Sequence, residues 1–450
     1  MKRYALQLLL LAVFTSSAAW GQINCATGSA STKLVCEFPV STGVLANSTA
    51  LGGSSSLSAQ GNATGVATAL NVAIATQLSQ LPLAGASAGT VLTYKNGVPE
   101  TFNNLGPILV DRAQTIGRNR FFWGFTASQY VFTNIDSQSL RSLPFSYYRT
   151  ACQAGSTSCS PSNAVSTTYT SEITSATFVV NQFVIVGTAG VTPKLDLSLI
   201  VPISRVSVGA AVPASTSTNY VVSSNNSYFS AAGPTSSNGG SASGVGDVEV
   251  GVKYALYVGE RTTLSTGAIF RVPSGVAENF LGSGAWGFNP FLAYSYLSKV
   301  SPHAKIGFQW NTASELNNPT YTNPIYSTTG ALESQPNAPL PGGVQYDIGA
   351  DWAASKRVTV AADFLGNQYL NTYRLSPSNS CVLTASSGQC TLSVPTTTLQ
   401  SSSYSISDLS TGLKWNPAKS LVFSANLLTQ LNNNGMRARP TPLLGIGYKF

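Results

Sequence analysis

Charged residues are scarce in this sequence, because only 9% of its 450 residues are Asp, Glu, Lys or Arg. It has a single histidine, His303. One histidine argues against a catalytic nucleophile activated by an imidazole base and against a metal site built on several histidines. The +8 formal charge forms no basic cluster, which argues against nucleic-acid binding. We therefore expect no enzyme, no metal or other cofactor, and no nucleic-acid partner.

Long hydrophobic runs are also missing, and the one short run lies at the N-terminus. Lys2 and Arg3 precede an apolar stretch from Tyr4 to Phe14, and Ala19 and Gly21 supply small residues where a signal peptidase reads. No later segment has the roughly 20 continuous apolar residues of a membrane-spanning helix. We expect residues 1–21 to be a signal peptide and the exported chain to begin at Gln22.

The six cysteines fall into three pairs that are close in sequence. Local pairing closes the shortest loops, and an exported protein meets an oxidising compartment. The predicted disulfides are Cys25–Cys36, Cys152–Cys159 and Cys381–Cys390. A metal site is the weaker alternative, because these spacings are longer than a Cys-x2-Cys knuckle.

Apolar residues occupy every second position from Leu444 to Phe450, with glycine or lysine between them. A strand places alternate side chains on opposite faces, so one face of this segment suits lipid. Ending on an aromatic residue resembles the C-terminal signal of bacterial outer-membrane barrels. Tyr448 and Phe450 would then be the insertion signal, read by the barrel-assembly machinery. The alternative is a buried strand at a soluble C-terminus.

From Gly117 onward, patterned segments alternate with breaks, and the breaks alternate between short and long. The expected strands lie near 118–134, 172–189, 194–212, 246–258, 261–273, 286–298, 303–313, 342–354, 357–373, 403–415, 419–432 and 441–450. An even strand number with short turns at one end and long loops at the other is typical of a transmembrane antiparallel up-and-down β-barrel. We expect this all-β barrel of about 12 strands over 117–450. Its short turns and both chain ends would be periplasmic, and its long polar loops would face outward.

Alternation within the strands assigns a lipid face and a lumen face. The lumen-lining candidates are Asp247, Glu249, Lys253, Arg271, Lys305, Gln309, Gln345, Asp347, Asp351 and Asp363. The lumen is therefore expected to be polar and of mixed sign. Aromatic residues such as Trp310, Trp352 and Trp415 would lie toward the rims or on the lipid face. His303 is expected at the surface, in a periplasmic turn.

Residues 22–116 do not share the rhythm of the barrel. Gly65 to Leu81 has apolar residues at helical spacing and is followed by Pro82, which predicts a short amphipathic helix. The 22–116 segment would be either a plug in the barrel or a periplasmic extension that touches nothing. Asp111 and Arg112 would either position this segment as a gate or form a solvated turn pair.

Several stretches resemble the bacterial outer-membrane transporter-like family named for the meta pathway of phenol degradation. They are Leu105–Gly117, Arg120–Phe125, Gly190–Pro202, Gly244–Asp247 with Lys253 and Tyr254, and Arg271–Gly275 with Gly282–Gly284. The resemblance covers roughly residues 65–450 by pattern. The Gly-x-Gly pairs are expected to be bends at the barrel rim, since neither leads into the helix of a βαβ unit.

The resemblance implies a channel or transporter for small compounds, apolar or aromatic ones among them. Its partners would be outer-membrane lipid and a small-molecule substrate. The alternative is a structural or adhesive outer-membrane barrel that presents its long Ser/Thr/Asn loops. An open path through the barrel, or out through its wall, would distinguish the two.

Overall fold

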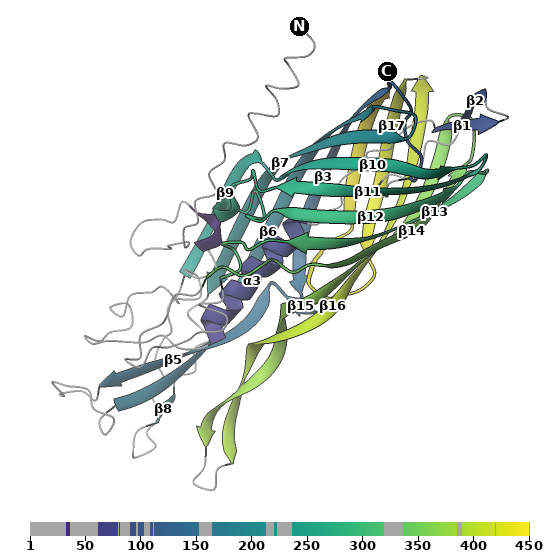
Figure 1. The fold of residues 1–450 in the computed structure, drawn as a ribbon. Helices are drawn as coiled ribbons and strands as arrows, with labels where there is room; N and C mark the ends of the chain where they lie inside the picture. Colours follow the sequence, from purple (N-terminus) through teal and green to yellow (C-terminus); the bar gives the residue numbers. More distant parts are fainter. Residues whose placement is uncertain are drawn as a thin grey trace.

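One antiparallel sheet that closes on itself dominates the computed structural model (Figure 1). The structure describes residues 33–36, 62–79, 81, 91–95, 98–102, 109–110, 112–152, 164–212, 220–222, 236–318, 336–384, 389–418 and 420–449. Twelve strands form the ring. They are β3 (Phe121–Ile135), β6 (Ala164–Gly190), β7 (Leu195–Val212), β10 (Val248–Val258), β11 (Thr262–Val272), β12 (Gly287–Tyr296), β13 (Val300–Asn311), β14 (Gly343–Ala353), β15 (Val358–Thr384), β16 (Cys390–Ala418), β17 (Leu421–Gln430) and β19 (Thr441–Lys449). The predicted fold class and the twelve predicted strands are confirmed.

The ring closes where the first and last strands meet. β3 pairs with β6 on one side and with β19 on the other, with Trp123 opposite Tyr448. Closure leaves no open sheet edge, so the backbone groups of the wall bond to one another, as a membrane interior requires. The short connections lie between strands at 191–194, 259–261, 297–299, 354–357 and 419–420. We call this the turn end of the barrel and the opposite end the loop end.

The loop end contains more strand than the sequence predicts. Within the expected loops lie β4 (Gln138–Ser139), β5 (Ser142–Cys152), β8 (Tyr220–Val222), β9 (Ser236–Val245) and β18 (Met436–Ala438). The expected loop at 374–402 is instead a hairpin of β15 and β16, which projects from the end opposite the C-terminus (Figure 1). This prediction was wrong because strands were expected only where apolar and polar residues alternate in the sequence. A hairpin beyond the membrane has no lipid face and needs none.

The outer surface of the wall is apolar. In β19, Leu444, Ile446 and Tyr448 are 62%, 40% and 43% exposed, which confirms the predicted stripe, while Phe450 lies outside the described residues. Trp310, Trp352 and other wall aromatics are likewise about half exposed. Apolar area left in water costs roughly 25 cal/mol per Å², so a continuous apolar exterior fits a lipid environment.

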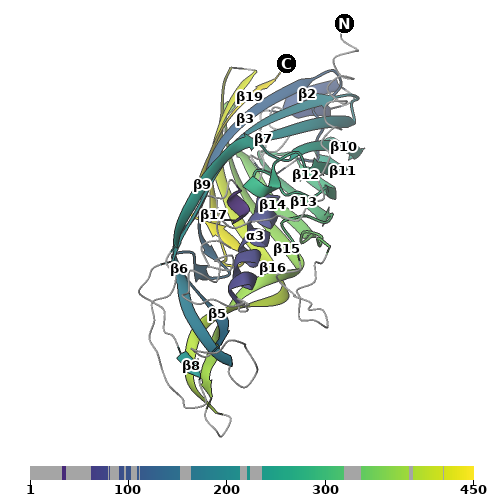
Figure 2. The ribbon, with the colours of Figure 1, turned by 90° about the vertical axis from the view of Figure 1, so that its left-hand side faces the viewer.

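Three helical segments of the described residues lie within the ring, in the loop-end half. They are η1 (Leu34–Cys36), α3 (Asn62–Leu78) and η4 (Ala277–Asn279). Figures 1 and 2 show α3 there. α3 confirms the predicted helix, but Leu70, Val72 and Ile74 on different sides of it are all buried. It is therefore enclosed rather than amphipathic. Among the described helices, none is both long and apolar enough to cross a membrane. A hairpin of β1 (Val91–Lys95) and β2 (Val98–Phe102) forms a separate small sheet.

Candidate functional site: the barrel interior

The ten lumen-lining candidates turn away from the outer surface. Asp247, Lys253, Arg271, Gln309, Asp351 and Asp363 are buried, and Glu249, Lys305, Gln345 and Asp347 are half-buried. Residues that alternate with them, such as Tyr254 and Trp352, are 44% and 47% exposed. Whether the ten residues line a path for a solute stays a prediction.

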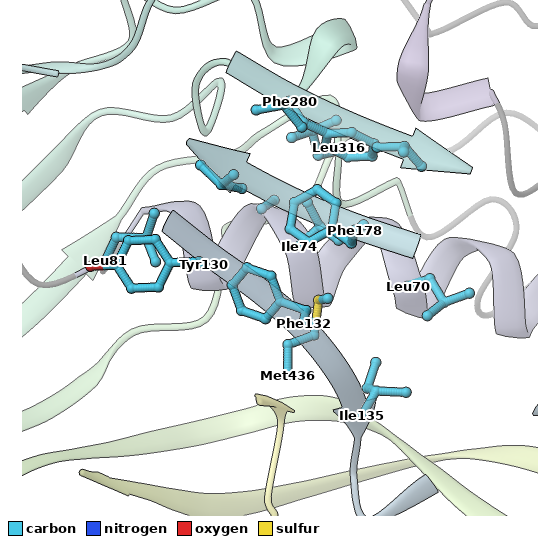
Figure 3. Close-up of a cluster of buried hydrophobic side chains, with 14 of the residues drawn as sticks. Leu70, Ile74, Leu81, Tyr130, Phe132, Ile135, Phe178, Phe280, Leu316 and Met436 are labelled. Atoms are coloured by element: carbon cyan, nitrogen blue, oxygen red, sulfur yellow. The ribbon is translucent and has the colours of Figure 1, made fainter. Parts of the chain in front are cut away.

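An apolar cluster fills the loop-end half of the interior (Figure 3). α3 contributes Leu70 and Ile74, β3 contributes Phe132, β6 contributes Phe178, and the connection from β11 to β12 contributes Phe280. The Phe132 and Phe178 rings lie 5.0 Å apart, and Phe280 meets Phe178 edge-on at 6.1 Å between centroids. The expectation of a polar lumen was therefore wrong for this half, where inward positions carry aromatic and aliphatic side chains.

The connection between β11 and β12 folds inward, which corrects the expectation that residues 274–285 form an outward loop. Phe280 is fully buried and has a left-handed backbone, with φ at 54°. Asp247 on the wall holds this loop: its carboxylate accepts from the Gly275 N–H at 3.2 Å and from the Ser283 N–H at 2.7 Å. A Cβ at Gly282 would lie 2.3 Å from Asp247 Oδ1, so this position needs glycine. The apolar Phe280 and Leu281 were the sequence signal for burial.

The inward loop is tied to the N-terminal part of the chain. Lys33 forms an ion pair with Glu278, and the Leu34 N–H donates to Asn279 Oδ1 at 3.4 Å. Glu315 lies near the same charges, outside the strands. Its burial raises its pKa above the ordinary value, Glu278 adds to the rise, and Lys33 opposes it. Residues 33–34 and the loop therefore form one connected unit.

α3 is bound at its C-terminal end to the wall. Arg271 Nη1 donates to the Ser79 carbonyl at 2.6 Å, and Nη2 donates to Asn311 Oδ1 at 2.6 Å. The last carbonyls of a helix lack intrahelical partners, so a guanidinium there satisfies one of them. Asn71 Nδ2 donates to the Val35 carbonyl at 3.0 Å, which joins α3 to η1.

Residues 112–116, here called the crossing segment, run across the inner face of the wall toward the turn end. Arg112 Nη2 donates to Asp351 Oδ2 at 2.8 Å, and the Arg112 carbonyl accepts from Lys253 Nζ at 3.1 Å. The Ala113 N–H donates to Ser295 Oγ at 3.0 Å. The Ile116 N–H donates to Asp196 Oδ2 at 3.0 Å. These partners come from β14, β10, β12 and β7. Their strand neighbours Leu197, Tyr254, Tyr294 and Trp352 are exposed. The crossing segment therefore lies inside the ring.

His303 is buried beside this segment, which corrects its expected place in a surface turn. It is 2% exposed and lies on β13, which begins at Val300, earlier than predicted. Its Nε2 is 2.8 Å from Asp363 Oδ1, and its Nδ1 is 3.5 Å from Asp351 Oδ2. Arg112 is 1% exposed and pairs with Asp351, so it is no solvated turn residue, while Asp111 lies outside the described residues.

Sequence reasoning missed two buried charges of this region. Asp196 lies 4.0 Å from Lys253, and Lys414 is 1% exposed on β16. Alternation would have found both, because the neighbours Leu197 and Trp415 are exposed on the other face. Arg112, Lys253 and Lys414 lie among Asp196, Asp351 and Asp363, so the turn-end interior holds buried charges of both signs.

The remaining motifs are structural. Gly246 lies in the break between β9 and β10, and Gly284, with φ at 65°, precedes β12, so the Gly-x-Gly pairs lie at bends. Cys36 is buried and disulfide-bonded, but its partner and the other two pairs stay predictions. Within the described part of the chain, no group of three or more His, Cys, Asp or Glu residues could hold a metal ion.

A closed antiparallel ring with an apolar exterior defines the class of transmembrane β-barrels of the outer-membrane type. The model of the family described as "Putative MetA-pathway of phenol degradation" matches residues 160–372. The resemblance expected from the sequence is thereby confirmed. A comparison with curated proteins found no match.

Two solved structures illustrate the similarity in fold. The COG4313 outer membrane channel from Pseudomonas putida F1 is 13% identical, with 75% of this chain and 98% of that chain covered and a TM-score of 0.41. The Ralstonia pickettii toluene transporter TbuX is 11% identical, with 74% and 89% covered and a TM-score of 0.31.

Proposed function

We propose that the protein is an outer-membrane channel or transporter for small apolar or aromatic compounds. The apolar cluster carries this proposal, because Phe132 and Phe178 project inward from a wall whose outer face is already apolar. Porin interiors that pass water and ions are polar. Aromatic and aliphatic side chains instead favour a solute that leaves water on entry. The family match supports the same class of solute.

The N-terminal segment acts in this proposal as a movable plug. α3 occupies the interior as part of the apolar cluster, and the crossing segment continues along the wall to the turn end. By the usual arrangement of outer-membrane barrels, the turn end faces the periplasm. A solute entering from the loop end would meet the apolar cluster first and the charged turn end last.

Uptake by whole cells tests the proposal. A porin-deficient bacterium that produces the full chain should take up radiolabelled toluene and phenol faster than cells with an empty vector. It should not take up a labelled disaccharide faster. Equal rates with and without the protein, when heat-modifiable migration shows a folded barrel in the outer membrane, would contradict the proposal.

The structural or adhesive alternative has one observation in its favour, the β15–β16 hairpin that projects at the loop end (Figure 1). If presenting this hairpin were the function, removal of residues 377–397 would abolish surface attachment. Under this alternative, cells with and without the protein would take up small compounds at the same rate.

A further inference from the structure

We infer that the buried Arg112–Asp351 ion pair holds the crossing segment against the wall and so keeps the turn end of the barrel closed. The inference rests on the proposed function, because it describes how passage through the same interior is controlled. It assigns Arg112 and Asp351 as positioning residues that act through the crossing segment. Neither residue is required to contact the solute.

The crossing segment connects the two halves of the interior. Just before it, Val110 is 1% exposed and belongs to the apolar cluster. At its other end, Thr115 Oγ1 donates to the Pro193 carbonyl in the short turn between β6 and β7, at 2.8 Å. The segment thus extends from the apolar cluster to the rim of the turn end. A solute leaving there passes the segment.

The Arg112–Asp351 contact joins two side chains of opposite full charge. The contacts of Ala113 and Ile116 are made by their backbone N–H groups, and Lys253 contacts the Arg112 carbonyl. Arg112 and Asp351 are 1% and 0% exposed, so neither charge has water to replace its partner. Removing one partner takes a full opposite charge away from the other, although His303 Nδ1 still lies 3.5 Å from Asp351 Oδ2, and this loss favours movement of the crossing segment toward water.

The wall is independent of this ion pair. β14 keeps its backbone pairing with β13 and β15 through Asp351, which lies opposite Ser301 and Ala361. The Arg112 side chain is thus held by the wall without contributing to the sheet. Neutralising Asp351 should release the crossing segment while the circular sheet of the wall stays intact, which is the behaviour required of a gate.

Thiol labelling measures release without relying on transport. Ala113 is fully buried, and the described part of the chain has no free cysteine, so Ala113→Cys introduces a reporter. In the purified, folded barrel we expect Asp351→Asn to raise the labelling rate by a water-soluble maleimide at least about tenfold, an equilibrium shift of about 1.4 kcal/mol. Arg112→Gln should do the same and serves if Asp351→Asn fails to fold.

Asp136→Asn is the matched control. Asp136 is also buried and ion-paired, with Arg374 at 3.0 Å, but it lies at the loop end, far from the crossing segment in the fold. It should leave the labelling rate unchanged. Equal rates in the parent and both crossing-segment variants would overturn the inference, as would an equal increase in the control, which would indicate general loosening.

A reversible crosslink connects release to conductance. Ala113→Cys with Ser295→Cys places two thiols where the segment now meets β12. In the Asp351→Asn background, the oxidised form should show the low conductance of the parent, and reduction should raise it. If the parent conducts and labelling rises, but no variant conducts more than the parent, the segment moves without gating and the inference fails. If neither the parent nor any variant conducts although labelling rises as expected, the failure lies with the proposed channel.

Discussion

At the scale of single residues, the buried charges of the turn end depend on close approach to glycine. Gly349 lies on β14 opposite Asp363 of β15 and His303 of β13. A Cβ there would lie 2.2 Å from Asp363 Oδ1 and 2.7 Å from His303 Nε2. Real atoms do not approach so closely, so the His303–Asp363 contact requires a residue without a side chain at this position.

Gly349→Ala should therefore destabilise the barrel by about 1–3 kcal/mol, since the added methyl must displace the His303–Asp363 pair. Urea unfolding of the refolded protein in detergent micelles measures the difference. Gly251→Ala is the control, because a Cβ there meets nothing nearer than Ser198 Cβ at 3.5 Å. Equal effects of the two substitutions would show that strand propensity alone, and not the close approach, sets the cost.

At the scale of elements, α3 is held mainly by burial among apolar side chains. Ile74 is fully buried in the apolar cluster near Phe178 (Figure 3), whereas Gln77 on the same helix is half-buried. We predict that Ile74→Ala weakens the docking of the helix by about 2–5 kcal/mol. Hydrogen exchange of the α3 amides should then become faster, while Gln77→Ala leaves it close to the parent. Unchanged exchange in Ile74→Ala would contradict packing as the main contribution.

The inward loop has a different anchor, the carboxylate of Asp247. Asp247→Ala removes the acceptor of the Gly275 and Ser283 N–H groups and the partner of Arg271, whose Nε is 3.6 Å away. Leaving such donors unpaired costs about 1–3 kcal/mol each. We predict that residues 274–285 become accessible to limited proteolysis in this variant. Asp347→Ala, which removes a half-buried carboxylate elsewhere in the wall, should not expose them.

At the scale of the whole molecule, the sequence predicts the wall well and the interior poorly. Alternation in a strand is a local pattern, so Tyr448 and Trp352 could be assigned to the lipid face from their neighbours alone. The interior depends on pairs that are distant in the chain, such as His303 with Asp363 or Arg112 with Asp351. No local pattern shows that these residues meet, and one misplaced strand start put His303 in a turn.

The interior also shows why loop length was an incomplete guide. Residues 274–285 read as a polar loop by length and turn residues, yet Phe280 is fully buried in the apolar cluster. A barrel of this size has room for a loop and a helix together, and each supplies apolar surface for the other to cover. α3, the inward loop and the crossing segment therefore occupy the barrel interior together. Displacing them should open a path through the barrel.

Planar-bilayer conductance tests this central claim most directly, with the full chain carrying Asp351→Asn, in which the crossing segment is released, compared to the same variant lacking residues 22–104. The truncated variant keeps the crossing segment and the complete wall, so it should remain a closed ring. We predict a small conductance for the full chain and a clearly larger, steady conductance for the truncated one. Equal conductance of the two, or none from either when both are folded, would contradict the view that α3 and its neighbours fill a channel.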